Sequence, residues 1–582
     1  MKALETFADS RAAADVAASN DAALTSRVRI GAWCLLPFAA LIEAVAGRHT
    51  MQDDGINYLD MGDAILRGDW KMAVNGIWSP LYPFLQGLAQ RLFKPSPYSQ
   101  FTVVHFVNFL IFLFALASFE FFLRASVAHR PQREGFDNVA RPLPDWAVFA
   151  VGYSVFLWSS VSLIGIQQVI PDMLMAGFIY LAAGLLLQIW AHPQSFLRFV
   201  LLGVILGIGY LAKAPVFPLA FVFFALAWLV AGKWRHATPR VLIAVLVFLA
   251  ITAPWVLALS KAQGRLTFGD SARYNYVLHV NNAAPYQYFQ DLGTATGHYK
   301  HTVRKIFDDP PIYEYATPLR GTAPIAYDPS YWSEGAIPRV YVKTQLSVIH
   351  RWLVYYLDLF FASQTSLFVG FVVLCFMAGR GLFLEQIAAR WPVWLIGLTG
   401  LGMYTLVHAE LRYIAVFLTL LWMGLFSGLE MPPSREGRRL ASLVTVAVVV
   451  AMATPTALSA AGELKGLRGQ PHNQWRVAED LQKMGVRPGD RVARFPQHFG
   501  LAWARLLRVT VVAQIPLENQ EDFWCAKPEK QAQVIEKFRG LGVTAVVAEE
   551  ISPTEACAPA PEWQKVGDGT YYALRLKPDA VK

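Results

Sequence analysis

The sequence predicts a polytopic α-helical membrane protein of about 11 spans with a C-terminal extracytoplasmic α/β domain. Of its 582 residues, 55% are hydrophobic and 16% are charged, whereas charged residues make up about a quarter of a soluble protein. Apolar runs of about 18 or more residues, long enough to cross a hydrocarbon core ~30 Å thick, recur before residue 460. These observations exclude a purely soluble enzyme.

The polar, alanine-rich residues 1–28 are expected to form a cytoplasmic tail, because Arg27 and Arg29 stand at the start of the first apolar run. This run covers residues 30–47 and ends in Ala44-Val45-Ala46, which is similar to a signal-peptidase site. A retained anchor is favoured over a cleaved signal peptide because the leader is unusually long. Either outcome leaves residue 48 outside the membrane.

The membrane domain is predicted over residues 29–460, and its other spans follow from the remaining apolar runs. They cover residues 101–123, 146–165, 172–190, 199–212, 213–232, 241–259, 352–379, 391–408, 412–430 and 440–459. The region 199–232 is too long for one crossing and short for two. We divide it at Lys213-Ala214-Pro215, because a cation and a proline are tolerated at membrane depth only near an interface or a cavity.

The short loops fix the predicted orientation, because Lys and Arg gather in cytoplasmic loops. The even-numbered loops contain the basic residues Arg124, Arg130, Arg133, Arg141, Lys233, Arg235, Arg240, Arg380, Arg390, Arg435, Arg438 and Arg439. These loops and the N-terminus are therefore expected in the cytoplasm of a cell whose inner (plasma) membrane holds the chain. Since the same loops account for much of the net charge of +9, no nucleic-acid partner is expected.

An odd number of spans places three bodies outside: the loops 48–100 and 260–350, and the C-terminal domain 461–582. The C-terminal domain combines alternating segments such as 491–495 and 543–548 with helical stretches such as 530–540, which predicts a small periplasmic or extracellular α/β domain. In an oxidising exterior, Cys525 and Cys557 could form a disulfide that closes a loop of about 33 residues. A buried unpaired pair is the alternative.

Two adjacent carboxylates, Asp53 and Asp54, follow the first span by a few residues. A surface pair that caps the next helix is one interpretation, because Asp is favoured at helix N-termini. The other interpretation is catalytic: neighbouring carboxylates repel, which raises one pKa and yields a usable general base.

Three more ionisable clusters lie at external turns. Asp172 follows the third span, where capping of the next helix is an alternative role. Lys213 lies at the fifth turn, where a lone lysine can also extend to the lipid headgroups. The last cluster, between spans nine and ten, contains His408, Glu410, Arg412 and Tyr413. His-x-Glu is a weak metal signal without further ligands, so no metal site is expected.

All four clusters fall on the outer face by a topology that other residues define. Acidic and cationic groups around one external cavity suit a reaction with a phosphorylated lipid, in which a cation holds the phosphate and a carboxylate deprotonates the incoming nucleophile.

These motifs resemble those of the C-type membrane glycosyltransferases, in the branch that uses polyprenyl-phosphate sugars and contains the protein O-mannosyltransferases and the lipid A aminoarabinose transferases. The resemblance extends over the whole membrane region. It rests on Asp53-Asp54, Pro171-Asp172, Tyr210-Leu211-Ala212-Lys213-Ala214-Pro215 and Glu410-Leu411-Arg412-Tyr413.

The resemblance implies roles for these residues. The proposed catalytic base of the family falls on Asp53, but Asp54 stands where many relatives carry glutamate, so the choice between them stays open. Lys213, Arg412 and Tyr413 are implied to contact the donor phosphate. Asp172 and the pair His408 and Glu410 are implied to support the site.

The implied reaction is inverting transfer of a sugar from a polyprenyl-phosphate carrier to a lipid, glycan or protein acceptor on the extracytoplasmic side of the membrane. The lipid-linked sugar is a substrate, and no cofactor is expected. A diphosphate-linked donor, as in an oligosaccharyltransferase or ligase, is an alternative. Two other classes are a glycan-binding membrane scaffold and a secondary transporter. Transporters place their ionisable residues near the midplane within internal repeats, whereas these clusters lie at one interface.

Overall fold

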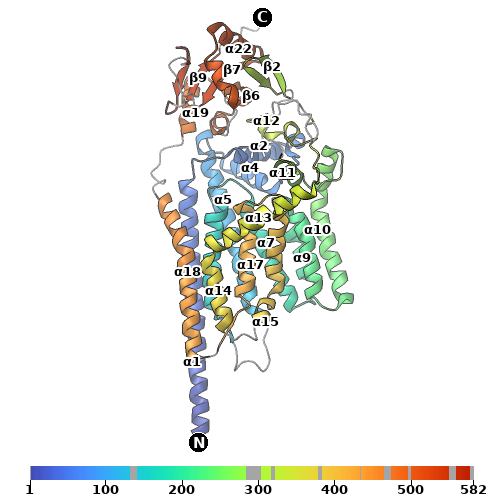
Figure 1. The fold of residues 1–582 in the computed structure, drawn as a ribbon, viewed down its shortest axis with the longest axis vertical. Helices are drawn as coiled ribbons and strands as arrows, with labels where there is room; N and C mark the ends of the chain where they lie inside the picture. The colour runs from blue at the N-terminus through green and yellow to red at the C-terminus, as the bar shows by residue number, and fades with distance from the viewer. Residues whose placement is uncertain are drawn as a thin grey trace.

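The computed structural model describes residues 2–130, 141–282, 300, 303–315, 321–377, 383–432, 434–464, 473–495, 500–549, 557, 559–569 and 571–576, with side chains described from residue 19 onward. The chain forms a helical bundle, and a sheet-containing domain sits on one end of it (Figure 1). The N-terminus lies at the opposite end of the bundle from this domain (Figure 1). Basic residues Arg133 and Arg380 lie outside the described residues.

Each predicted apolar run is mainly helical over the residues that the structure describes. The bundle helices are α1 (Lys2–Ala46), α5 (Gln100–Ala128), α6 (Asp145–Trp158), α7 (Asp172–Ala191), α8 (Phe196–Ala212), α9 (Val216–Val230), α10 (Trp234–Gln263), α13 (Val342–Ala362), α14 (Thr365–Met377), α16 (Trp391–Thr405), α17 (Leu411–Phe426) and α18 (Arg435–Glu463). Six helices in the described part of the chain are long and apolar enough to cross a membrane, and the bent pair α13 and α14 would make 7. Helices of 15 to 17 residues such as α8 and α9 are about 22 to 26 Å long, so the count of eleven spans stays a prediction.

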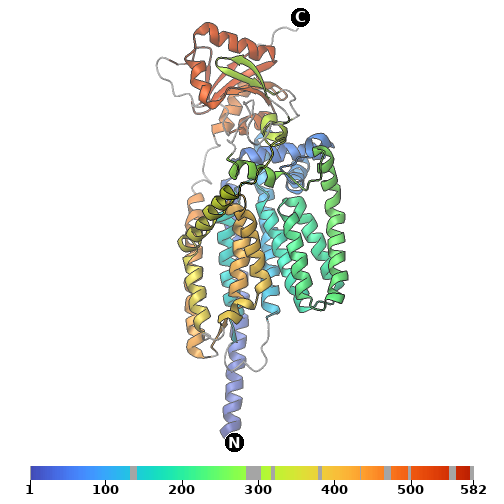
Figure 2. The same cartoon turned by 45° about the vertical axis from the view of Figure 1, so that its right-hand side comes forward.

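The predicted boundary inside 199–232 is confirmed, because α8 ends at Ala212 and α9 begins at Val216. The predicted span 352–379 is not one continuous helix, and whether it crosses as a single span stays a prediction. Helix α13 begins at Val342 and is bent by 74° relative to α14. In Figures 1 and 2, α13 runs obliquely near the outer end of the bundle, whereas α14 runs along it. The polar first half of α13, with Lys343 and Arg351, fits an interfacial position rather than the apolar layer.

The even-numbered loops meet at one end of the bundle. Strands β1 (Arg141–Pro142) and β4 (Glu430–Met431) pair and join the second loop to the tenth. Arg390 in the eighth loop donates a hydrogen bond to the Ser126 carbonyl at 2.8 Å, and the Arg240 guanidinium donates to the Pro193 carbonyl at 3.1 Å. We call this the basic end. It lies opposite the C-terminal domain (Figure 1).

The loop 48–100 forms a helical layer over the other end of the bundle. It consists of α2 (Asp53–Arg67), α3 (Trp70–Ala73) and α4 (Leu81–Phe93). Helices α2 and α4 cross closely at Gly62 and Gly87, and a Cβ on Gly62 would collide with the Pro83 carbonyl. Glycine at this position therefore lets α2, with its first-turn acids, pack directly on α4.

The C-terminal domain is built on a mixed sheet of seven strands in the order β2-β3-β6-β5-β7-β9-β8. Its strands are β2 (Arg304–Asp308), β3 (Pro311–Glu314), β5 (Arg491–Phe495), β6 (Thr510–Gln514), β7 (Val543–Glu549), β8 (Gln564–Val566) and β9 (Tyr571–Arg575). Strand β5 pairs in parallel with β6 and β7, and the other pairs are antiparallel.

The loop 260–350 is joined to this domain. Its hairpin β2-β3 extends the sheet, while its helices α11 (Ser271–His279) and α12 (Pro324–Tyr327) lie near the layer of α2 (Figure 1). The domain helices are α19 (Asn473–Lys483), α20 (Ala502–Leu507), α21 (Gln520–Trp524) and α22 (Pro528–Gly540). The loop thus ties the domain to the bundle.

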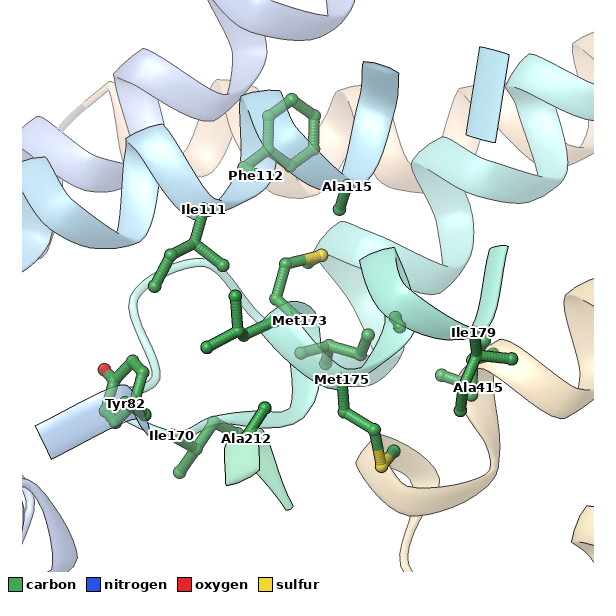
Figure 3. Close-up of a cluster of buried hydrophobic side chains, with 14 of the residues drawn as sticks. Tyr82, Ile111, Phe112, Ala115, Ile170, Met173, Met175, Ile179, Ala212 and Ala415 are labelled. Atoms are coloured by element: carbon green, nitrogen blue, oxygen red, sulfur yellow. The ribbon is translucent and has the colours of Figure 1, made fainter. Parts of the chain in front are cut away.

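Close packing fixes the helix ends beneath the external layer. Figure 3 shows Met173 and Met175 of α7 among buried side chains of neighbouring elements, including Ile111 and Phe112 of α5 and Ala212 of α8. These side chains are almost fully excluded from solvent, and protein interiors at this density resist shifts of even one methylene. The first residue of α7, Asp172, is therefore held in place.

The predicted disulfide between Cys525 and Cys557 is confirmed. The two cysteines are 32 positions apart. Closing a loop of this length lowers the entropy of the unfolded chain, which corresponds to about 4 kcal/mol of free energy at 25 °C. We expect the variant Cys525→Ser with Cys557→Ser to lose about this much free energy of unfolding in its C-terminal domain. Denaturant unfolding without reductant measures the loss. Cys34→Ser, which removes an exposed free thiol, is the control, and equal midpoints for all three proteins would contradict the expectation.

Candidate active site

A cavity of about 930 Å³ lies between the layer of α2, the C-terminal domain and the ends of the bundle helices that face this domain. Seven residues that the sequence analysis selected line it: Asp53, Asp54, Asp172, Lys213, His408, Arg412 and Tyr413. The eighth, Glu410, contacts two of these seven. Residues 360 positions apart in the chain therefore meet around one space, because each lies at or near the end of a helix on the side of the C-terminal domain.

Asp172 and Lys213 form an ion pair in the cavity wall, with Nζ 2.5 Å from Oδ1. Asp172 is the first residue of α7, and Lys213 lies in the turn between α8 and α9. The Asp172 side chain is 1% exposed, so its charge needs this partner. Lys213 Nζ also lies 4.1 Å from the centre of the Tyr413 ring. The lysine thus faces the cavity.

Arg412 and Tyr413 begin α17 and are joined to the turn before it. The Arg412 Nε donates to Glu410 at 2.6 Å, and its terminal nitrogen lies 3.3 Å from the Tyr413 hydroxyl. Burial raises the pKa of Glu410, but the hydrogen bond from His408 and the charge of Arg412 outweigh burial and lower this pKa to about 2. Glu410 is therefore a permanent anion that holds Arg412 at the cavity.

His408 packs face to face on His279, with ring centres 3.7 Å apart, and lies 3.2 Å from Glu410. Burial and the nearby His408 lower the pKa of His279 to about 4, so His279 is neutral at pH 7. No group of three or more metal-ligating side chains gathers among the residues with described coordinates. The His-x-Glu motif is joined to Arg412, because Glu410 contacts both His408 and Arg412.

The two carboxylates of the first motif have different surroundings. Both Asp53 oxygens accept hydrogen bonds from the backbone of the C-terminal domain, from Gly500 and Leu501, at 3.1 Å. Asp54 is open to the cavity. Burial by the surrounding protein raises the pKa of Asp54. Arg412 and Lys213 oppose this rise, and the neighbouring acids add to it. Neither aspartate is the N-cap residue of α2. They are its first two residues, and the N-cap position is occupied by Gln52, whose side chain makes no capping bond.

The roof of the cavity contains residues that the sequence analysis missed. Trp332 and Tyr274 come from the loop 260–350, and Arg494 and Gln514 come from strands β5 and β6. Arg494 is 1% exposed. An arginine inside a strand whose neighbours are apolar is unusual, since arginine is almost never fully buried unless paired. The position of Arg494 in a predicted strand is therefore a feature of the sequence that points to a role of the C-terminal domain in the cavity.

Helix α20 of the C-terminal domain is joined to α2 by a second set of contacts. The Arg505 guanidinium bridges Asp60 at 2.6 Å and Asp63 at 2.8 Å. Asp60 also accepts hydrogen bonds from the Thr322 backbone amide and hydroxyl. The three external bodies therefore meet at Asp60.

No protein-family model and no curated protein matches the chain. Solved structures that are similar to it include the following three. ArnT from Cupriavidus metallidurans in the apo state is 14% identical over 94% of this chain and 98% of that chain, with a TM-score of 0.39. The same protein bound to undecaprenyl phosphate is 15% identical over 93% and 97%, with a TM-score of 0.40. The Archaeoglobus fulgidus oligosaccharyltransferase in complex with Zn and sulfate is 14% identical over 88% and 67%, with a TM-score of 0.45. These similar structures are C-type glycosyltransferases, the fold family that the motifs of this chain resemble.

Proposed function

We propose that the chain catalyses inverting transfer of a sugar from a polyprenyl-phosphate carrier to a lipid, glycan or protein acceptor on the extracytoplasmic side of the membrane. The observation that carries this proposal is the convergence of carboxylates and cations in one cavity. Asp53 and Asp54 lie on one element of its wall, and Lys213 and Arg412 lie on others. A base and a phosphate-binding group are the two parts that this reaction needs.

In the proposed reaction, the acceptor hydroxyl or amine attacks the anomeric carbon of the donor sugar as Asp53 or Asp54 takes its proton. The bond between the anomeric carbon and the phosphate oxygen breaks, and its electron pair leaves with the polyprenyl phosphate. General base catalysis of this kind contributes about 10²- to 10⁴-fold in rate. Because the phosphate leaves well, no general acid is required, and attack from the opposite face inverts the anomeric centre.

Lys213 and Arg412 would stabilise the charge that develops on the departing phosphate. An ammonium has three donors and a guanidinium five, so the bonds to Asp172 and Glu410 leave further donors on both groups. The paired acids fix the direction of each cation before the donor arrives, and preorganised donors stabilise a transition state most effectively. In this proposal the acids Asp172 and Glu410 support the site without touching the sugar.

The cavity wall also has an apolar part that suits an isoprenoid tail. Pro218 and Phe268 lie near Lys213, and Met403 and Leu406 line the wall beside α17. The large side chains Phe268 and Leu406 are 38% and 51% exposed. Apolar exposure next to a phosphate-binding group fits a lipid whose phosphate enters the cavity while its tail stays among the helices.

The same proposal includes the orientation of the chain. The cavity lies at the end of the bundle opposite the basic end. Because basic loops stay in the cytoplasm, the N-terminus would be cytoplasmic and the C-terminal domain periplasmic or extracellular, in the inner (plasma) membrane.

A lipid-linked transfer assay on the purified protein tests this function. Polyprenyl-monophosphate carriers with several sugars are compared with a diphosphate-linked oligosaccharide, each with and without a chelator. We expect transfer from a monophosphate carrier, unaffected by the chelator, and no transfer by the variant Asp53→Asn with Asp54→Asn. The control variant, Glu479→Gln with Glu536→Gln, removes two exposed carboxylates of the C-terminal domain.

Each other outcome has a definite meaning. Transfer from the diphosphate donor alone would make the protein an oligosaccharyltransferase or ligase. Full transfer by the double Asn variant would remove the proposed bases, and glycan binding without transfer by either protein would indicate a scaffold.

A further inference from the structure

We propose that Asp54 is the general base and that Asp53 is a positioning residue through which the C-terminal domain holds that base at the cavity. This inference rests on the proposed function and assigns different roles to two carboxylates that are adjacent in the sequence. It also gives the C-terminal domain a part in the active site.

The contacts of Asp53 commit its carboxylate to the C-terminal domain. The Gly500 amide donates to both of its oxygens and the Leu501 amide to Oδ1, all at 3.1 Å. Backbone N–H groups bind the charged form of a carboxylate. These bonds stabilise the carboxylate anion, so Asp53 is a weaker proton acceptor than a carboxylate without such donors.

Asp54 has the opposite surroundings. It is open to the cavity and makes no hydrogen bond to the residues that the structure describes. The charged groups that act on it are Arg412, Lys213, Asp53 and Glu410. Burial raises the pKa of Asp54. The two cations lower this pKa, and the two acids raise it further. A base whose pKa is moved toward neutrality is more effective than an ordinary aspartate.

Helix geometry explains why neighbours differ. Successive residues of an α-helix are turned by about 100°, and residues three, four or seven positions apart share a face. Asp54 therefore shares a face of α2 with Tyr58, and both line the cavity. Asp53 lies on the adjoining face with Asn57 and Asp60. Asp53 and Asn57 also line the cavity, and Asp60 binds Arg505 of α20.

The two faces of α2 thus have two partners. The face with Asp53, Asp60 and Asp63 binds the segment that begins at Gly500 and continues as α20. The face with Asp54 points to the substrate space. Docking of the C-terminal domain fixes the rotation of α2 about its axis, and this rotation sets where the Asp54 carboxylate lies.

The single variants Asp53→Asn and Asp54→Asn form a matched pair, because the same atom changes at adjacent positions. We expect Asp54→Asn to lower kcat at least 100-fold, while KM for the donor changes little. The acid limb of the pH profile, which is the fall of kcat at low pH as the base becomes protonated, should disappear in this variant. Asp54→Glu should restore part of kcat together with the limb. We expect Asp53→Asn to retain the limb, with kcat lowered less than 10-fold.

The position of the limb gives a readout that a merely structural role of Asp53 would not move. Since the charge of Asp53 adds to the raised pKa of Asp54, Asp53→Asn should shift the acid limb to lower pH. Loss of the limb in Asp53→Asn with retention in Asp54→Asn would overturn the proposal. An unshifted limb in Asp53→Asn would overturn the arrangement of charges on which it rests.

Hydrogen–deuterium exchange tests the positioning role without sugar transfer. The amides of Gly500 and Leu501 should exchange at least 10-fold faster in Asp53→Asn and Asp53→Ala than in the wild type, and at the wild-type rate in Asp54→Asn and Glu479→Gln. Unchanged exchange in the Asp53 variants would overturn the positioning role alone. Absence of transfer by the wild type from every donor would overturn the proposed function and the base with it, while the exchange result would still decide what Asp53 binds.

Discussion

Replacing Lys213 by methionine is expected to lower kcat/KM for sugar transfer by about 100- to 1,000-fold. Lys213 Nζ lies 2.5 Å from Asp172 and faces the cavity. Methionine keeps an unbranched side chain but removes every donor, so in the proposed reaction the leaving phosphate would lose one of its two cations. It also leaves the Asp172 carboxylate, 1% exposed, as an unpaired charge that repels the phosphate. Both consequences act in the same direction.

A second variant separates these two consequences. Breaking a buried ion pair by removing one partner costs about 3 to 5 kcal/mol, whereas removing both charges costs far less. Lys213→Met with Asp172→Asn should therefore recover thermal stability relative to Lys213→Met while transfer stays low. Lys71→Met, at an exposed position of α3, is the control. Wild-type kcat/KM in Lys213→Met would show that this lysine does not stabilise the leaving group.

The positions of the site residues could be predicted because the membrane constrains them. Helices that cross a bilayer end at the same two surfaces, so a charged residue at the outer end of one helix lies at nearly the same depth as a charged residue at the outer end of another. Asp172, Lys213 and Arg412 are such residues, and apolar runs and basic loops located their depth from the sequence. This is why clusters far apart in the chain could be placed around one cavity.

The contribution of the C-terminal domain could not be predicted in the same way. Strand β3 pairs with β6 although the two are about 200 residues apart, and no hydrophobic period encodes such a pairing. Gly500 and Leu501 bind Asp53 through backbone amides, which every residue except proline has. The bend between α13 and α14 falls at Ser363 and Gln364, a polar pair too short to divide the apolar run in the sequence analysis. The strand pairing and the backbone hydrogen bonds depend on how distant parts of the chain pack against each other, and a single sequence does not predict this packing.

The second large effect is expected at Arg505, which joins α20 to α2. Its guanidinium donates to Asp60 at 2.6 Å and to Asp63 at 2.8 Å, and its side chain is 12% exposed. Arg505→Met removes one partner and leaves Asp60, 3% exposed, as a buried charge. We expect the free energy of unfolding to fall by about 3 to 5 kcal/mol. Denaturant unfolding checks this, with Arg508→Met as the control, since Arg508 is the exposed C-cap residue of α20.

The pH dependence of this loss identifies its cause. Burial raises the pKa of Asp60, and Arg505 opposes the rise, so Arg505→Met should raise that pKa further. A carboxyl with a raised folded pKa binds more protons folded than unfolded, and its protonation therefore stabilises the folded state as the pH falls. The stability deficit of Arg505→Met should shrink from pH 8 toward pH 5. A deficit that stays constant over this range would assign the loss to the packing of the arginine side chain and not to the unpaired charge of Asp60.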